Sequence, residues 1–227
     1  MKISEIFHSI QGEGMLTGVP SVFVRTSGCN LRCVWCDTPY TSWAPEGEEM
    51  SVSEVLARVG SYAAKHAVVT GGEPMIAPGI VELTESIQKA GLHVTIETAG
   101  TVYQRVACDL MSISPKLENS TPFEREGGKW VAQHERVRYQ PQVLKQLISE
   151  YEYQLKFVVA SPDDMPEIAN MIEDLHADRT RVVLMAEGTT SDAIRGRAPW
   201  LTEICKRESF RYSPRLHIDL WGNRRGT

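Results

Sequence analysis

The chain has 227 residues, of which 42% are hydrophobic and 23% are charged, a composition typical of an ordinary globular protein. Its net charge of −5 argues against a general nucleic-acid binder, which carries a basic surface. No apolar stretch approaches the roughly 18 residues of a membrane span, and the first residues do not resemble a secretory signal. We therefore expect a protein of the reducing cytoplasm that acts on a small molecule.

Six short runs of apolar and β-branched residues predict strands. Each run is continuous rather than alternating, which is typical of parallel strands that are buried on both faces. In chain order the runs are Ser21–Arg25, Ala67–Thr70, His93–Thr98, Leu110–Ser114, Leu155–Ala160 and Arg181–Ala186.

Segments with helical periodicity lie between most of these runs. Ser51 and Glu54 have the spacing of a capping box, which predicts a helix over Val55–Lys65. Asp163 or Asp164 is expected to cap the last predicted helix. The remaining predicted helices are Gly79–Lys89, Pro141–Glu150 and Met165–Ala177.

The alternation of strands and helices predicts right-handed βαβ units around a parallel sheet. About six parallel strands are too few to close an eight-stranded barrel. We therefore expect an α/β fold, an open partial (β/α) barrel of about six parallel strands that forms a single domain over residues 1–227.

Two segments do not fit this alternation. Glu118–Gln140 is polar and highly charged, and we predict a long excursion from the sheet, which in a compact domain indicates a functional or mobile segment. The tail Leu216–Thr227 begins with apolar residues that favour a strand over Leu216–Ile218, and it ends in a polar, glycine-containing sequence.

Three cysteines, Cys29, Cys33 and Cys36, have the spacing C-x3-C-x2-C directly after the first predicted strand. A closed structural metal site takes four protein ligands, whereas a catalytic site keeps one position open. Thiolates select zinc or iron–sulfur clusters, and a [4Fe–4S] cluster on three cysteines would leave one iron free for a small molecule. A zinc site that adds a distant histidine stays open as an alternative. Cys108 and Cys205 are isolated, and we expect them to be buried small hydrophobic residues.

Polar turns follow the next three predicted strands, at Thr70–Pro74, Glu97–Thr101 and Ser114–Lys116. The carboxyl ends of parallel strands meet at one edge of a sheet, and ligands bind there. We therefore expect these turns and the cysteine loop, residues 29–36, to line one site.

The cysteine motif, with Trp35 before its last cysteine, resembles the cluster motif of the radical S-adenosylmethionine (SAM) superfamily, and Gly71–Pro74 resembles its methionine-binding turn. The I-Q-G-E-G motif at Ile10–Gly14, together with Cys36–Thr38 and Leu216–His217, narrows the resemblance to the 7-carboxy-7-deazaguanine synthase family. This resemblance implies a carbon–nitrogen lyase of the queuosine pathway of tRNA modification. Its reaction is the radical ring contraction of 6-carboxy-5,6,7,8-tetrahydropterin to 7-carboxy-7-deazaguanine, with loss of ammonia.

The resemblance also implies which residues bind metals and cofactor. Cys29, Cys33 and Cys36 would hold the [4Fe–4S] cluster, and Thr38 would bind Mg²⁺. The backbone at Gly72 would allow the methionine part of SAM to approach, because glycine has no Cβ. The implied SAM contacts are Trp35, Cys36, Asp37, Gly72, Glu73, Glu97, Ser114, Pro115, Lys116, Met185 and Glu187.

Substrate contacts are implied in the same way. Arg25 is the candidate partner of the substrate carboxylate, because a planar guanidinium suits bidentate pairing. His217, within a C-terminal segment 216–227, is expected to cover the substrate. The full implied set is Ile10, Gln11, Gly12, Glu13, Arg25, Thr70, His217 and Thr227.

Two positions depart from the family pattern, since Ala99 and Met185 stand where relatives carry more polar residues. Two other functions stay open: a glycyl-radical activase on the same scaffold, and a zinc-stabilised binding protein without catalysis. The resemblance further implies a homodimer and an external one-electron reductant of the flavodoxin or ferredoxin type. No nucleic-acid or membrane partner is expected.

Overall fold

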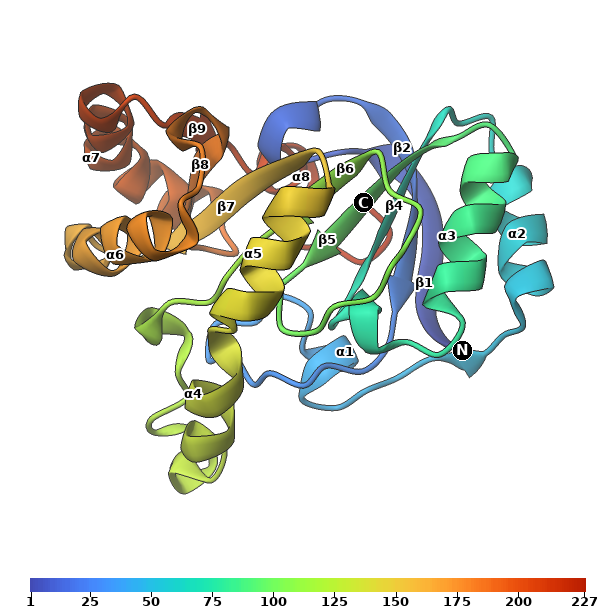
Figure 1. Ribbon diagram of the computed structural model, residues 1–227, viewed down its shortest axis with the longest axis horizontal. Coiled ribbons are helices and arrows are strands. Elements are labelled where there is room, and N and C mark those ends of the chain that lie inside the picture. The colour runs from blue at the N-terminus through green and yellow to red at the C-terminus, as the bar shows by residue number, and fades with distance from the viewer.

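The structure, a computed structural model, describes all 227 residues and is built on one nine-stranded sheet (Figure 1). The strands lie in the order β3-β1-β2-β4-β5-β6-β7-β8-β9. From β2 to β9 all neighbours are parallel, whereas β1 is antiparallel to both β2 and β3. The sheet stays open, with β3 and β9 at its edges. The strands are β1 (Lys2–Ile10), β2 (Pro20–Thr26), β3 (Glu48–Glu49), β4 (His66–Gly71), β5 (His93–Thr98), β6 (Leu110–Ile113), β7 (Tyr153–Val159), β8 (Val182–Ala186) and β9 (Arg211–Ser213).

All six predicted strands are confirmed, as β2 and β4 to β8, with ends that shift by at most two residues. Three strands were not predicted. β1 contains polar residues such as Lys2, Ser4 and Glu5, so it has no continuous apolar run, and its antiparallel pairing fits that pattern. β3 and β9 contain only two and three residues, too few to show a pattern.

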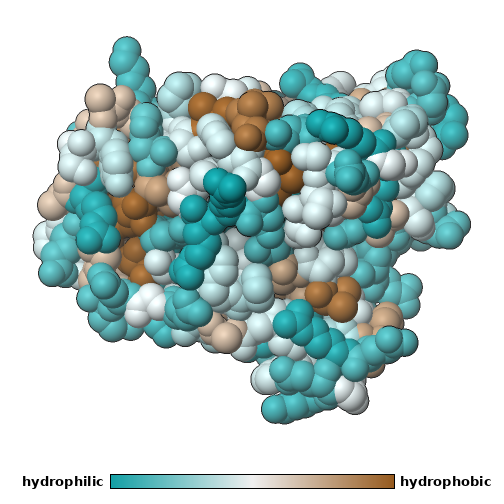
Figure 2. Space-filling view, turned by 180° about the vertical axis from the view of Figure 1, so that it is seen from behind, coloured by the Kyte–Doolittle hydropathy of each residue, from teal (hydrophilic) through white to brown (hydrophobic).

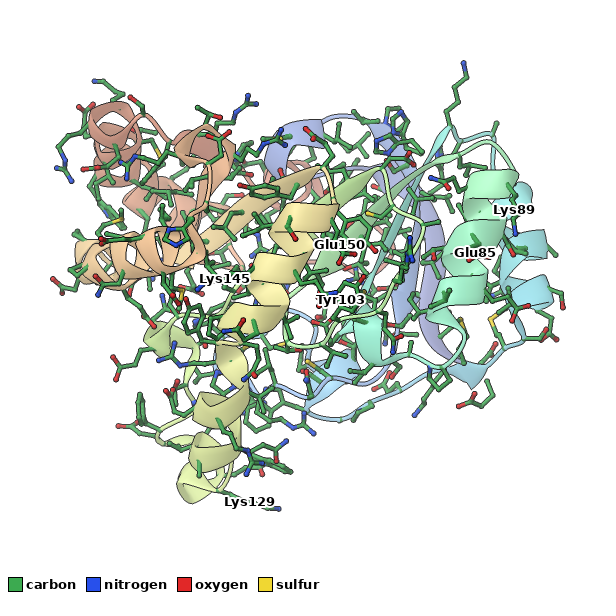
Figure 3. All side chains as sticks on the ribbon, in the orientation of Figure 1. Glu85, Lys89, Tyr103, Lys129, Lys145 and Glu150 are labelled. Atoms are coloured by element: carbon green, nitrogen blue, oxygen red, sulfur yellow. The ribbon has the colours of Figure 1, made fainter.

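Helices cover the sheet, with α3, α5 and α6 in front of it and α8 behind it in the view of Figure 1. A cluster of 38 buried residues, among them Val24, Val69 and Ile96, forms the main core. On the helix side, the Tyr103 hydroxyl donates to Glu150 at the end of α5, and Glu85 pairs with Lys89 along α3 (Figure 3). The helices are α1 (Pro39–Ser42), α2 (Val52–Gly60), α3 (Ile80–Lys89), α4 (Val131–Arg138), α5 (Pro141–Glu150), α6 (Met165–Leu175), α7 (Ser191–Glu208) and α8 (Leu216–Trp221).

The four predicted helices are confirmed, as α2, α3, α5 and α6. The capping box forms: the Ser51 Oγ accepts from the Glu54 amide at 3.3 Å, and the Glu54 carboxylate accepts from the Ser51 amide at 2.7 Å. This helix ends at Gly60 rather than at Lys65. Asp164 occupies the predicted N-cap position of α6, but its carboxylate accepts from the amides of Ala160 and Ser161 before the helix and from no amide within it.

Two other predictions need correction. Leu216–Ile218 forms the start of α8 and not a strand, because the amides of Ile218 and Asp219 both donate to the Arg215 carbonyl and thereby open a helix. Glu118–Gln140 does leave the sheet, but it contains α4 and two short 3₁₀ turns. α7 was not predicted.

Cys205 is buried in the main core, as predicted, whereas Cys108 is only partly buried against that core. From behind, the surface is mostly polar, with hydrophobic residues gathered in separate small patches (Figure 2). Each helix is too short or too polar to span a lipid bilayer.

Candidate functional site

One cavity at the carboxyl ends of the parallel strands collects the residues that the sequence singled out. Of the residues predicted to bind metal, cofactor or substrate, only Glu73 and Pro115 do not line it. Its walls come from the cysteine loop after β2, from the turns after β4, β5, β6 and β8, from β1 and from the C-terminal segment. The expectation that these turns meet at one edge of the sheet is therefore confirmed.

The three cysteines of the loop all line this cavity, whereas Cys108 and Cys205 do not. Cys33 is buried, and Cys29 and Cys36 are partly buried. No three histidine, cysteine, aspartate or glutamate side chains come together as the ligands of a single metal ion. Three soft thiol donors around one cavity, without a fourth protein ligand, fit a [4Fe–4S] cluster with an open iron better than a zinc site.

Burial controls the protonation of two of these thiols. Desolvation raises the pKa of both Cys29 and Cys33 to about 12, so the metal-free protein keeps these side chains protonated at neutral pH. A cluster binds thiolates, so its assembly has to displace these protons.

The excursion Glu118–Gln140 supports the cysteine loop from outside. The Val34 amide donates to the Ser120 carbonyl at 2.8 Å, and the Trp35 indole donates to the Asn119 carbonyl at 3.0 Å. His134 of α4 is 1% exposed, and its Nδ1 accepts from the Arg32 amide at 3.1 Å. Nδ1 must therefore be unprotonated, which leaves Nε2 to donate to the Ser120 hydroxyl at 2.8 Å.

The turn after β4 holds the same loop from inside. A Cβ added to Gly72 would lie 2.2 Å from the Gly28 carbonyl oxygen, and the Glu73 amide donates to that oxygen at 2.9 Å. The missing Cβ of Gly72 thus makes room for the cysteine loop itself, whereas the sequence suggested only room for the cofactor.

Glu73 has a different position from the one predicted. Its side chain is fully buried, and its carboxylate accepts from the Thr98 hydroxyl at 2.7 Å and from the Ala99 amide at 2.8 Å. Burial raises the pKa of this carboxyl. Glu73 therefore joins the ends of β4 and β5 beneath the cavity instead of facing it.

The I-Q-G-E-G loop lies against two other parts of the site. The side-chain Nε2 of Gln11 donates to Glu97 Oε1 at 3.1 Å, and the Thr70 hydroxyl donates to Glu97 Oε2 at 2.9 Å. The His217 ring fills the space beside Gly12, where an added Cβ would lie 2.0 Å from its Nδ1. Predicted cofactor and substrate residues are thus in direct contact.

Arg25 lies near the end of β2, and most of its side chain is buried. Its side chain is 17% exposed, and its Nε pairs with Glu5 at 2.6 Å, while Tyr40 also donates to Glu5. Burial by itself would lower the pKa of Arg25, but the interactions with Tyr40 and Glu5 are stronger than this effect and raise the pKa. Only Nε bonds to the protein, so the two terminal nitrogens stay available in the cavity.

Sequence reasoning missed two buried cations in the cavity, Lys156 and Arg215, each 5% exposed. Both bind Glu13: Lys156 pairs with Oε2, and Arg215 pairs with Oε1 at 3.0 Å. Burial alone would raise the pKa of Glu13, but these two cations outweigh it and hold that pKa far below its usual range. The position of Lys156 inside the apolar run Leu155–Ala160 could have indicated that it is buried, whereas no local pattern in the sequence marks Arg215.

Met185 and Glu187, two of the implied SAM contacts, already make protein contacts. Met185 is 4% exposed in β8, and Glu187 pairs with Arg197 at 3.0 Å. After β6, the Lys116 amino group donates to the Ser114 carbonyl at 2.7 Å. Met185, Glu187, Ser114 and Lys116 line the cavity, whereas Arg197 does not.

The end of the chain reaches the mouth of the cavity. Asn223, Arg224 and Thr227 line it. The Arg225 guanidinium stacks 3.8 Å from the Tyr40 ring centroid and pairs with Glu46 at 3.0 Å. These contacts hold the C-terminal segment over the same side of the cavity as Arg25.

Known proteins that are similar to this chain are radical SAM proteins, in agreement with a cysteine-lined cavity. The model of the radical SAM superfamily matches residues 23–115. The chain is 47% identical to the 7-carboxy-7-deazaguanine synthase of Rhodopirellula baltica, over 99% of this chain and 88% of that one. It is 44% identical to the synthase of the same name from Halobacterium salinarum, over 98% and 91% of the two chains. The crystal structure of QueE from Escherichia coli matches with a TM-score of 0.69 and 29% identity, over 93% of this chain and 92% of that chain.

Proposed function

The chain belongs to the 7-carboxy-7-deazaguanine synthase family of radical SAM enzymes, and we propose how its cavity carries out that reaction. The reaction is the conversion of 6-carboxy-5,6,7,8-tetrahydropterin to 7-carboxy-7-deazaguanine and ammonia, in queuosine biosynthesis. One observation supports the proposal most directly: the three cysteines and all the predicted substrate residues line the same cavity. The full-length similarity to synthases favours this reaction over that of a glycyl-radical activase.

On the cofactor side, Cys29, Cys33 and Cys36 hold the cluster. The cluster and SAM, when bound, supply the radical that abstracts hydrogen from the substrate. The protein contributes position and shielding: the turn at Gly72 and the excursion that contains His134 keep the cysteine loop in place from two sides.

On the substrate side, three charged or titratable groups have distinct tasks. The free terminal nitrogens of Arg25 pair with the substrate carboxylate. Glu13 stays ionised because Lys156 and Arg215 flank it, so it accepts hydrogen bonds from N–H groups of the pterin ring. Desolvation lowers the pKa of His217, which therefore faces the substrate as a neutral imidazole at pH 7.

We further propose that Thr38 binds Mg²⁺ through its hydroxyl, which lies in the cavity and accepts from Thr41 Oγ1 at 3.4 Å. One hydroxyl is a weak site, so the ion keeps water ligands and takes oxygens from the substrate carboxylate. Chelation of Mg²⁺ should then lower product formation while SAM cleavage continues. An external one-electron reductant of the flavodoxin or ferredoxin type and a homodimeric assembly complete the proposal, and light scattering of the purified protein tests the latter.

The decisive experiment is anaerobic turnover. Reconstituted protein should be brown and contain about four irons per chain. With SAM, dithionite, Mg²⁺ and carboxytetrahydropterin it should form 7-carboxy-7-deazaguanine, which mass spectrometry identifies. A colourless protein that folds with one zinc, or a brown protein that leaves the pterin unchanged, would contradict the proposal.

A further inference from the structure

Arg215, just before α8, uses each nitrogen of its guanidinium group for a different segment of the chain. Nε pairs with Glu13 at 3.0 Å, Nη1 donates to the Gly188 carbonyl after β8, and Nη2 pairs with Asp37. Its partners Asp37 and Glu13 lie 178 and 202 residues away in sequence. Arg215 therefore joins three parts of the cavity: the loop between β1 and β2, the residue after the cysteine loop, and the turn after β8.

The charges around Arg215 form a continuous, largely buried row. Asp37, Arg215, Glu13 and Lys156 alternate in sign, and each is paired with the next. Removing one member of a buried ion pair leaves its partner unpaired in a poorly solvated place, which is costly. The row thus favours a single arrangement of the segments that carry these four side chains.

The two carboxylates on Arg215 belong to segments with different proposed roles. Asp37 directly follows Cys36, the last cysteine of the loop, whereas Glu13 belongs to the I-Q-G-E-G loop, which is proposed to contact the pterin. A lysine could not replace Arg215 fully, because a single ammonium lacks the planar fork that binds two carboxylates and a carbonyl together.

We propose that Arg215 is a positioning residue that fixes the I-Q-G-E-G loop, residues 10–14, relative to the cysteine loop, and so couples SAM cleavage to product formation. This inference rests on the function proposed above. Hydrogen transfer needs the two reacting atoms in contact, and a misplacement of about 1 Å can cost roughly 100-fold in rate. Arg215 would set that distance through Glu13 and Asp37, without itself touching the reacting atoms.

The test compares Arg215→Gln and Arg215→Lys with a matched control, Arg181→Gln. Arg181 lies just before the amino end of β8, does not line the cavity, and also pairs with two carboxylates, Glu152 at 2.5 Å and Asp178 at 3.7 Å, although it is only partly buried whereas Arg215 is buried. Four quantities are measured for each variant: iron content, the rate of SAM cleavage, the ratio of 5′-deoxyadenosine to 7-carboxy-7-deazaguanine, and hydrogen exchange in the cofactor-free protein.

For Arg215→Gln we expect normal iron content and SAM cleavage within about threefold of the wild-type rate, with the 5′-deoxyadenosine to product ratio raised about tenfold or more. Arg215→Lys should show a smaller rise, and Arg181→Gln none. In the cofactor-free protein, exchange should accelerate over residues 10–14 and 214–222 in both Arg215 variants, because the Leu216 amide bonds to the Gly12 carbonyl there.

Two results would overturn the inference: an unchanged ratio in both Arg215 variants, or a parallel loss of cleavage and product such as a general loss of stability produces. If Arg215→Gln does not fold, the inference is tested by the ratio of 5′-deoxyadenosine to product in Arg215→Lys. Failure of the wild-type protein to form product would refute the proposed function instead, and hydrogen exchange would still decide whether Arg215 joins the two segments.

Discussion

Replacing Arg25 with glutamine should weaken substrate binding much more than SAM binding. Glutamine keeps a donor for Glu5 but removes the charge that faces the cavity. Truncating one partner of a buried charge pair costs about 2–5 kcal/mol. Arg25 is 17% exposed, so the lower end applies, and about 2 kcal/mol corresponds to roughly 30-fold in affinity.

The assay is equilibrium binding of carboxytetrahydropterin and, separately, of SAM to the reconstituted protein without reductant. SAM affinity should stay within about threefold, since Arg25 contacts Glu5 and not the cysteine loop. Uncoupled SAM cleavage should persist.

Glu5→Gln is the matched control, because it removes the ion pair but leaves the guanidinium in the cavity. It should lower stability by about 1–3 kcal/mol and reduce substrate affinity much less than Arg25→Gln does. Equal loss of substrate and SAM affinity in Arg25→Gln, or an equal loss of substrate affinity in Glu5→Gln, would refute the assignment and make Arg25 a structural residue.

Three further predictions follow from the same site. Alanine at Cys29, Cys33 or Cys36 should abolish both cluster absorbance and SAM cleavage, whereas Cys108→Ala and Cys205→Ala should keep them; loss of the cluster in either of the last two would indicate a fourth protein ligand. Deletion of Trp221–Thr227 should leave the cluster intact and raise 5′-deoxyadenosine relative to product, because residues of this tail line the cavity mouth; unchanged coupling and substrate affinity would rule out a covering role. Burial lowers the pKa of His134 from 6.5 to about 4. Between these pH values the unfolded chain therefore binds more protons than the folded protein. The free energy of unfolding of the metal-free protein should then fall as the pH is lowered through this range. His134→Gln should flatten this part of the stability curve in denaturant titrations, and an unchanged slope would contradict the buried neutral imidazole.

The sequence by itself determined the parts of this protein that depend on neighbours along the chain. Continuous apolar runs were enough to predict the six buried parallel strands, because such strands need hydrophobic residues on both faces. The capping box at Ser51 and Glu54 located α2 for a similar local reason. The cysteine spacing likewise identified the loop that brings three thiols to the cavity and is proposed to hold the cluster, since its three donors come from one short segment.

Only the tertiary structure decided the contacts between distant segments. A strand was predicted at Leu216–Ile218 from its apolar residues, yet helix α8 forms there, with Ile218 buried in the core. Gly72 was explained by the cofactor, whereas the Gly28 carbonyl occupies the space beside it. Arg215 showed no signal at all, because a charged residue is recognisable as buried only when its partners, here Asp37 and Glu13, have been brought to it by the fold.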